Sequence, residues 1–415
     1  MRRRRLTLSA LVALAVAGFA VGAVIGSSGS GGRPTARCAG QSTTAGQAAG
    51  QRSTAAGPCA DAEGEGEAAT TEESKPSLVE TLRPGELAGE RIVVSIGGTG
   101  LTAELRAAIA KGKVAGVVLF EADFLSRAAG RALIAEVQAV PRPRRLAHLP
   151  LLVMTDQEGG EVKRVDGPPE ASAAAMGREG PAYSRKQGRL TAANLQSLGV
   201  NVDLAPVLDV GRPGGVIADT ERAFADTAPG VVNSAVPFAE GLEEGGVAAT
   251  AKHFPGLGAA TENTDFEAQT LPLTKGELLD TDIAPYRAYV AAGGRLVMLA
   301  TAIYPALSPR PAAFSHRIVT GELRRRLGFR GVTITDSLGS AAVAEFGGQR
   351  EVAVDGAAAG DDLLLFDDLP SALAGHDALV AQLHKGGLKR APFLAAAGRV
   401  LRLRAELASG SHLSR

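Results

Sequence analysis

The sequence has 415 residues, with 44 basic and 44 acidic side chains, two cysteines and no tryptophan. Its formal charge is balanced, and no basic patch is interleaved with aromatic residues, so nothing supports binding to nucleic acid, and no such partner is expected. The part that follows residue 76 is long enough for one large α/β domain.

The chain begins with a basic cluster at residues 2–5, followed by an uncharged, largely apolar run at 6–25. Twenty residues at a helical rise of about 1.5 Å just cross a bilayer. Positive charge before the run predicts a cytoplasmic amino terminus and a body outside the cytoplasm. We interpret residues 1–25 as a signal anchor, with a cleaved signal peptide as the alternative. The protein is therefore expected to be membrane-anchored or secreted, touching the membrane only through this segment.

Residues 26–76 are rich in Gly, Ser, Ala and Thr and become acidic toward their end. They have no periodic apolar pattern, which is typical of a flexible linker. Both cysteines, Cys38 and Cys59, lie in this linker. Outside the cytoplasm they can pair in a disulfide, and two unpaired thiols are the alternative.

From residue 77 to the end, short apolar segments alternate with helical patterns. Strands are expected at 91–96, 114–120, 150–155, 200–204, 246–251, 295–300, 331–335 and 362–366. Helices are expected at 102–111, 124–140, 183–198, 232–244, 277–292, 315–327, 349–359, 369–384 and 391–407. Eight buried strands separated by helices predict an α/β fold of the TIM-type (β/α)8 barrel class over 77–415. A doubly wound open sheet is the competitor, but residues 97–100 lack the full glycine fingerprint of a dinucleotide site.

Polar side chains follow several of these strands: Asp156, Asp209, Lys252, His253 and Asp336. The carboxyl ends of barrel strands meet at one face, where ligands bind. Each residue alone has an ordinary explanation, such as a helix N-cap for Asp336 or a satisfied core histidine for His253. Buried charges are unfavourable unless they are hydrated, paired or used, so four strands ending in this way predict a polar pocket.

Three runs carry a family resemblance: 156–164 (DQEGGEVKR), 252–256 (KHFPG) and 335–338 (TDSL). They resemble the signatures of glycoside hydrolase family 3, and of its single-barrel β-N-acetylglucosaminidase branch in particular. The resemblance implies a carbohydrate substrate, including sugars from peptidoglycan, and Asp336 as the nucleophile. It also implies a set of sugar-binding residues: Asp156, Arg164, Arg222, Lys252 and His253. We expect a monomer that uses no cofactor and no metal.

The chain departs from this pattern in one loop. The branch carries an Asp-x-His pair there, in which the histidine is the acid/base, whereas this chain has Asn263, Thr264 and Asp265. Asp265 is the expected replacement, and Glu262 and Glu267 are alternatives. The predicted function is a retaining exo-glycosidase that acts on terminal β-N-acetylglucosaminides or β-glucosides. The alternative is a degenerate barrel that binds glycan or cell wall without turnover.

Overall fold

The computed structural model describes residues 77–98 and 100–410. The predicted anchor, the linker and both cysteines lie outside these residues, so those expectations stay predictions. None of the helices formed by the described residues combines the length and the apolar character that a membrane span requires.

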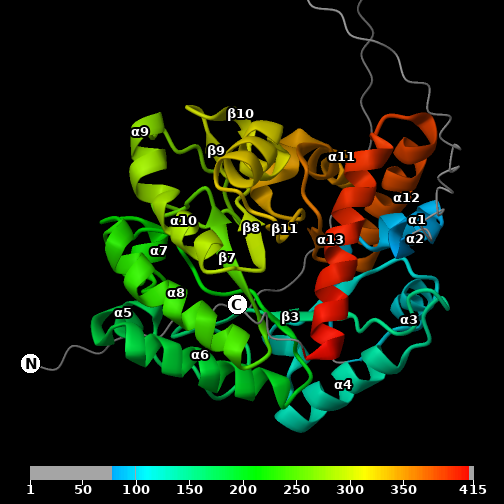
Figure 1. The fold of residues 1–415 in the computed structure, drawn as a ribbon, viewed down its shortest axis with the longest axis horizontal. Helices are drawn as coiled ribbons and strands as arrows, with labels where there is room; N and C mark the ends of the chain where they lie inside the picture. Colours follow the sequence, from blue (N-terminus) through cyan, green and yellow to red (C-terminus); the bar gives the residue numbers. More distant parts are fainter. Residues whose placement is uncertain (1–76, 99, 411–415) are drawn as a thin grey trace, which may run out of the picture. The chain divides into compact units, whose positions relative to one another are not determined.

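Eight parallel strands form a nearly closed barrel, in which each strand pairs with its neighbours in the chain (Figure 1). The strands are β1 (Ile92–Ser95), β2 (Gly116–Val118), β3 (Leu152–Thr155), β6 (Val202–Asp203), β7 (Ala248–Phe254), β8 (Leu296–Leu299), β11 (Val332–Thr335) and β12 (Leu364–Phe366). A parallel bridge between Ile334 and Leu363 joins the last two strands. All eight predicted strands are present, consistent with the expected (β/α)8 barrel.

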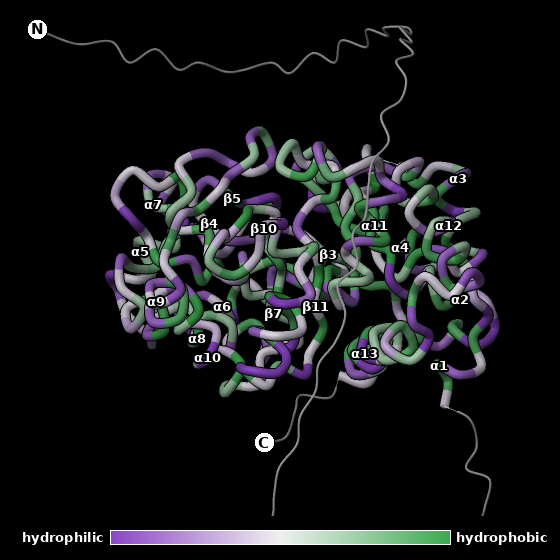
Figure 2. Tube along the Cα trace, turned by 90° about the horizontal axis from the view of Figure 1, so that it is seen from above, coloured by the Kyte–Doolittle hydropathy of each residue, from purple (hydrophilic) through white to green (hydrophobic). Residues whose placement is uncertain are grey.

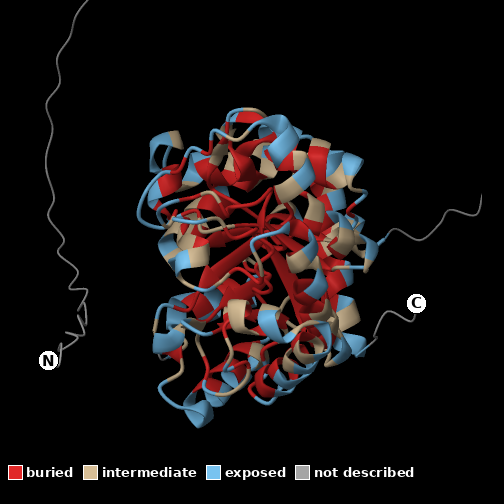
Figure 3. Ribbon diagram, turned by 90° about the vertical axis from the view of Figure 1, so that its left-hand side faces the viewer, coloured by how far each residue is buried: buried red, intermediate tan, exposed pale blue. Residues whose placement is uncertain are grey.

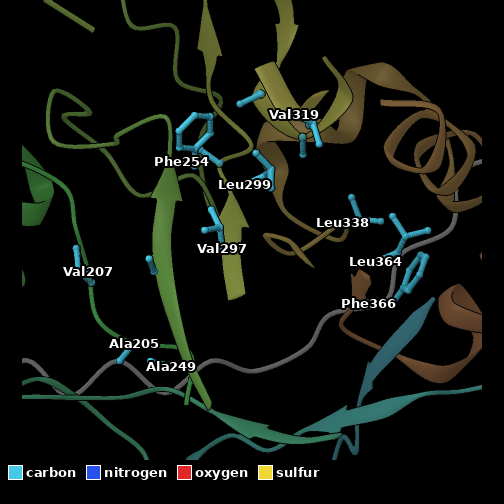
Figure 4. Close-up of a cluster of buried hydrophobic side chains, with 14 of the residues drawn as sticks. Ala205, Val207, Ala249, Phe254, Val297, Leu299, Val319, Leu338, Leu364 and Phe366 are labelled. Carbon is cyan, nitrogen blue, oxygen red and sulfur yellow. The ribbon is translucent and has the colours of Figure 1, made fainter. Parts of the chain in front are cut away.

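Alternate strand residues face opposite sides of the barrel wall, as the period of a β-strand requires. In β8, Leu296 and Met298 belong to one buried cluster, while Val297 and Leu299 belong to another. The first cluster fills the barrel interior. The second packs between the strands and the surrounding helices, and Figure 4 shows part of it. Figure 3 shows that the strands are buried throughout, while the helices expose their outer sides.

Helices surround the strands, and Figure 2 shows that they alternate between hydrophilic and hydrophobic segments. The longer helices are α3 (Ala103–Ala110), α4 (Arg127–Ala139), α6 (Pro181–Gln196), α8 (Ala228–Glu244), α10 (Ala284–Ala291), α11 (Gln349–Ala359), α12 (Leu369–Lys385) and α13 (Arg390–Ser409). Side-chain caps fix several helix starts. Thr102 accepts a hydrogen bond from the Leu105 amide, and Asp368 accepts one from the Ser371 amide.

Two predicted helices differ from simple α-helices. The segment at 277–292 divides into α9 (Lys275–Glu277), the π-helical η2 (Leu278–Asp282) and α10. Pro285 at the start of α10 has no amide hydrogen to donate back into the preceding turn, so the regular ladder is interrupted there. The segment at 315–327 is the π-helical η4 (Arg317–Arg326).

Short elements that the sequence analysis did not anticipate complete the fold. They are the helices α1 (Leu78–Thr81), α2 (Pro84–Gly89), α5 (Ala173–Glu179) and α7 (Val216–Asp219), the hairpins β4 (Gln157–Gly159) with β5 (Val162–Lys163) and β9 (Ile303–Tyr304) with β10 (Ser308–Pro311), and the 3₁₀ turns η1 (Glu121–Asp123), η3 (Ala312–Phe314) and η5 (Ala341–Phe346). The β4–β5 hairpin and η5 both contribute to the site.

The C-terminal helix α13 closes the amino-terminal end of the barrel. Its Val400 and Leu403 join the interior cluster. Arg404 is fully buried and forms an ion pair with the buried Glu90. It also donates to the Pro150 carbonyl at 2.8 Å, just before β3. The helix is thereby tied to segments that are more than 250 residues earlier in the chain.

Candidate active site

A cavity of about 400 Å³ opens at the carboxyl ends of the strands. Its walls come from the residues that end or follow β2, β3, β7, β11 and β12, together with α7 and the loop at 263–265. The seven residues that the sequence analysis assigned to the site all line it: Asp156, Arg164, Arg222, Lys252, His253, Asp265 and Asp336. A larger cavity, of about 520 Å³, lies against α8, and its arginines pair with neighbouring glutamates. The predicted site residues therefore all lie in the smaller cavity.

Lys252 is the centre of a buried charge network. Its ammonium lies 2.6 Å from Asp156 Oδ1 and 2.8 Å from Glu158 Oε1. Arg222 donates twice to Glu158, from Nε and from a terminal nitrogen, each at 2.8 Å. This is the bidentate geometry that makes a guanidinium a rigid partner. Two cations and two carboxylates thus hold one another at fixed positions.

The pairing outweighs the unfavourable burial of these charges. Burial alone would raise the pKa of the Glu158 carboxyl, but Arg222 and Lys252 hold that pKa well below its usual range. Burial alone would likewise lower the pKa of the Lys252 ammonium, but Asp156 and Glu158 raise it. Glu158, Arg222 and Lys252 are therefore charged at neutral pH, and the network presents fixed donors and acceptors to the cavity.

Glu158 lines the cavity, and the sequence analysis did not single it out. It lies two residues after Asp156, on the short strand β4, and alternate strand residues share a side. The two-residue spacing from Asp156 was the sequence signal that could have identified Glu158. The structure makes Glu158 the link between Arg222 and Lys252.

His253 is oriented by Asp209. The imidazole Nδ1 lies 2.7 Å from Asp209 Oδ2, and Asp209 Oδ1 accepts from the backbone amides of His253 and Leu257. A carboxylate on Nδ1 fixes the ring orientation and places the proton there. Asp209 is fully buried and is not among the residues that line the cavity, so it acts through His253.

Asp336 follows β11 directly and is partly buried. Its Oδ1 accepts from the Ser337 amide at 2.9 Å, and its own amide donates to the Leu299 carbonyl on β8. Burial raises the pKa of the Asp336 carboxyl; His253 and Lys252 lower it, and the charge of Asp265 raises it further. The net direction is upward. His253 and Lys252 therefore offset only part of the effect of burial on Asp336.

Arg164 follows the β4–β5 hairpin and has unused donors. Its Nε is buried and has no hydrogen-bond partner among the described residues. Its guanidinium lies 5.9 Å from the centre of the Phe120 ring, which also lines the cavity. A buried, unpaired guanidinium nitrogen is unfavourable unless a ligand or water accepts its hydrogen.

The loop that replaces the Asp-x-His pair is held against η5. Ala341 donates to the Asp265 carbonyl at 3.1 Å, and Ala342 donates to the Thr264 carbonyl at 3.3 Å. Asn263, Thr264 and Asp265 line the cavity. Glu262 and Glu267, the two alternatives, are exposed and do not line it. The structure therefore brings only Asp265 of these three carboxylates to the site.

The described residues contain no cluster of three or more His, Cys, Asp or Glu side chains arranged to hold a metal ion. The site consists instead of paired charges, an unpaired guanidinium nitrogen and the carboxyl groups of Asp265 and Asp336. This composition suits recognition of hydroxyl groups and acid/base chemistry.

Comparisons with known proteins identify the family. The profile of the glycosyl hydrolase family 3 N terminal domain matches residues 88–403. An uncharacterized secreted glycosyl hydrolase of Arthroderma benhamiae is 35% identical over 333 residues, which are 78% of this chain and 93% of the relative. A beta-hexosaminidase of Stenotrophomonas maltophilia is 36% identical over 267 residues, which are 62% of this chain and 77% of that enzyme.

Solved structures show the same likeness. A beta-N-acetylhexosaminidase from Beutenbergia cavernae superposes with a TM-score of 0.73 at 32% identity. The superposition covers 78% of this chain and 99% of that chain. A family 3 beta-N-acetylglucosaminidase from a Paenibacillus species gives a TM-score of 0.75 at 30% identity and covers 80% of this chain, which spans only 64% of its length. The chain belongs to glycosyl hydrolase family 3, and it is an O-glycosyl hydrolase.

Proposed function

We propose that this protein is a retaining, exo-acting glycoside hydrolase that removes terminal β-linked N-acetylglucosamine or glucose. The observation that carries the proposal is the cavity itself. One part of its wall holds fixed hydroxyl-binding groups, and another holds the carboxyl groups of Asp336 and Asp265. Relatives described as hexosaminidases support the choice of N-acetylhexosaminides as the first substrates to test.

The sugar-binding part follows from the charge network. Asp156 keeps acceptor capacity for sugar hydroxyls beyond its bond to Lys252. Arg164 offers the unpaired Nε, and Arg222 and Lys252 stay fixed through Glu158. Because these partners are already paired before substrate arrives, little ordering remains when it binds.

The chemical steps assign one role to each of two carboxyl groups. Asp336 attacks the anomeric carbon as the glycosidic C–O bond breaks, and Asp265 gives its proton to the departing oxygen. A water molecule then attacks the glycosyl-enzyme, Asp265 takes the water's proton, and the bond to Asp336 breaks. Two inversions give overall retention. Such enzymes place the two carboxyl groups about 5–5.5 Å apart.

Location and assembly are part of the same proposal. The apolar run at 6–25 and the secreted relative favour a site outside the cytoplasm, where glycans of the cell wall or the environment are the substrates. We propose that the protein acts as a monomer and that its membrane contact, if the run is not cleaved, is confined to that segment.

The decisive experiment is a panel of chromogenic β-glycosides offered to the purified protein and to Asp336→Asn. The substitution keeps the shape but removes the attacking charge, so turnover should fall by several orders of magnitude, or about 4 kcal/mol or more of barrier. Affinity for the sugar product should change little, because the sugar-binding network is untouched. Turnover by the variant near the wild-type rate would exclude Asp336 as the nucleophile. A wild-type protein that binds sugar without cleaving any substrate would identify a binding barrel.

A further inference from the structure

Ser340 is a buried cavity residue whose hydroxyl is left unused by the described part of the chain. It lines the cavity and is only 5% exposed, and its Oγ has no hydrogen-bond partner among the described residues. Among the described residues that line the cavity, only Arg164 has a comparable buried and unpaired side-chain atom, its Nε. A buried hydroxyl without a partner is unfavourable, so Ser340 marks a point at which a ligand can supply one.

The backbone fixes Ser340 and leaves its hydroxyl available. Its amide donates to the Ser337 carbonyl at 3.3 Å, and its carbonyl accepts from the Val343 amide at 3.2 Å. Ser340 is the N-cap residue of η5, a position at which a serine side chain usually accepts from an amide of the first turn. No such cap bond forms here. The hydroxyl that would ordinarily serve the helix therefore remains available to the cavity.

Ser340 lies on the side of the barrel that carries Asp336. Both residues follow β11, and Ser340 comes just before η5. Around the barrel, β8, β7 and β6 separate β11 from β3 in one direction, and β12, β1 and β2 separate them in the other. Asp156 and Arg164, which follow β3, are therefore placed across the barrel from Ser340. Under the proposed function, a sugar bound by Asp156 and Arg164 reaches Asp336 with its anomeric carbon, so Ser340 is at that end of the ring.

Two substituents lie near the anomeric carbon: the leaving group and the substituent on the adjacent carbon, C2. An exo-acting enzyme encloses the terminal sugar, and the leaving group extends toward solvent. Asp265, the proposed acid/base, is exposed and marks this open side, whereas Ser340 is buried. The position of Ser340 therefore suits the C2 substituent rather than the leaving group.

The strands on either side of β11 contribute apolar walls to the cavity. Met298 on β8 and Leu365 on β12 both line it, and both are almost fully buried. An acetamido group combines a polar amide with a methyl group, so it can use one hydroxyl together with apolar walls. A C2 hydroxyl could also bond to Ser340, but it would leave the apolar surface without a partner.

We propose that Ser340 is a specificity-determining residue: its hydroxyl hydrogen-bonds to the C2 acetamido group of the terminal sugar and favours N-acetylglucosaminides over glucosides. This inference rests on the proposed function, which sets the orientation of the sugar. A serine hydroxyl both donates and accepts, so it matches either the carbonyl or the N–H of that group. A substrate without a matching group leaves the buried hydroxyl unpaired, which is how such contacts discriminate.

The test compares para-nitrophenyl β-N-acetylglucosaminide with para-nitrophenyl β-glucoside, which share a leaving group and differ only at C2. Ser340→Ala should lower kcat/KM for the first substrate by about fivefold, the effect of one neutral hydrogen bond, and should change the second little. Ser234→Ala is the matched control. Its Oγ is also buried and without a partner among the described residues, but it lies on α8 and does not line the cavity. It should leave the ratio of the two kcat/KM values unchanged.

A second readout needs no turnover. Ser340→Ala should weaken the binding of N-acetylglucosamine by about fivefold and leave the binding of glucose nearly unchanged, as titration of the two free sugars would measure. The melting temperatures of both alanine variants should match that of the wild type, because neither hydroxyl has a partner among the described residues to lose.

Equal losses on both glycosides would overturn the inference, because Ser340 would then not distinguish the C2 substituent. An unchanged ratio in Ser340→Ala, with turnover still abolished in Asp336→Asn, would also overturn it and leave the proposed function intact. A lower melting temperature in Ser340→Ala with unchanged sugar affinities would assign the hydroxyl to the fold instead. A wild-type protein that cleaves no glycoside would refute the proposed function, and the two dissociation constants would then decide the role of Ser340 in binding.

Discussion

At the residue scale, the charged side chains that follow β3 and end β7 are fixed by partners from other parts of the barrel. Lys252 on β7 is held by Asp156 after β3. His253 is held by Asp209, which follows β6 by several residues. Such pairing removes rotamer freedom before substrate binds, which is the physical content of preorganisation. Asp265 differs, because only its backbone is fixed.

The role of Asp265 leads to a sharp prediction. Asp265→Ala should greatly slow the cleavage of methylumbelliferyl and natural glycosides, because their leaving groups need a proton. It should spare the first step on dinitrophenyl glycosides, and azide should accelerate the second step by attacking the glycosyl-enzyme. Steady-state rates on both substrates, with and without azide, check this. Equal losses on both substrates without azide rescue would show that Asp265 has only a structural role.

Asp203 gives a prediction about stability and pH. It is fully buried below the site, Oδ1 accepts from the Gln157 amide at 3.0 Å, and Oδ2 has no partner among the described residues. Burial raises the pKa of the Asp203 carboxyl well above its ordinary value; Gln157 and Lys252 lower it, whereas Asp156 and Glu158 raise it. A carboxyl whose pKa is raised on folding loses stability as pH rises from the unfolded pKa toward the folded one.

Asp203→Asn keeps the shape and the bond to Gln157 but cannot ionise. Its melting temperature should match that of the wild type near pH 4 and exceed it increasingly toward neutral pH. Thermal unfolding of both proteins across this range is the measurement. A melting temperature lowered by the same amount at every pH would mean that the substitution disturbs packing or hydrogen bonding and that ionisation of Asp203 does not limit stability.

At the element scale, β7 and the loop that follows it differ in burial. β7 is entirely buried from Ala248 to Phe254, so its backbone fixes Lys252 and His253 rigidly. The loop at 261–267 is mostly exposed and meets η5 through two backbone hydrogen bonds. Under the proposed function, β7 supplies the rigid binding groups and the less buried loop supplies the proton donor, and segments with few buried contacts are generally the more mobile ones.

Helix α13 gives an element-scale prediction. Arg404→Ala should destabilise the protein by about 3–5 kcal/mol, because Glu90 would remain buried without its counter-charge. Replacing both partners, as Glu90→Gln with Arg404→Met, should lower the free energy of unfolding by less than Arg404→Ala does. Denaturant unfolding of the three proteins measures the difference. If the double variant is the least stable, packing rather than charge pairing makes Arg404 important.

At the scale of the whole molecule, the barrel should fold without the residues that precede it. The described fold begins at Ser77. Val79 on α1 approaches Gly398 on α13, which makes the first described helix part of the barrel. A protein of residues 77–415 should therefore show cooperative unfolding and full near-ultraviolet circular dichroism. Starting at residue 91 should impair folding, because α1, α2 and Glu90 are removed. A molten 77–415 protein would place the boundary earlier.

The sequence by itself determined the barrel strands, the order of the elements and most of the cavity. Short apolar runs with helical segments between them are local patterns, and in a parallel barrel the ends of all strands meet at one face. The residues Asp156, Lys252 and Asp336 could therefore be placed together before the structure was known. The sequence pattern also predicted an ordinary helix where the structure has the π-helical η4, because the wider i→i+5 hydrogen bonding has no clear sequence signal.

The tertiary structure alone decided which loop carboxylate reaches the cavity and what lies beside it. The sequence favoured Asp265 but left Glu262 and Glu267 as alternatives, because side-chain direction in an irregular loop follows from contacts outside it. Backbone hydrogen bonds from η5, more than 70 residues later, turn Asp265 toward the site. Asp367 approaches Ser337 only because β11 and β12 close the barrel. Long-range pairing of this kind leaves no periodic signal in the chain, so only the folded structure could show it.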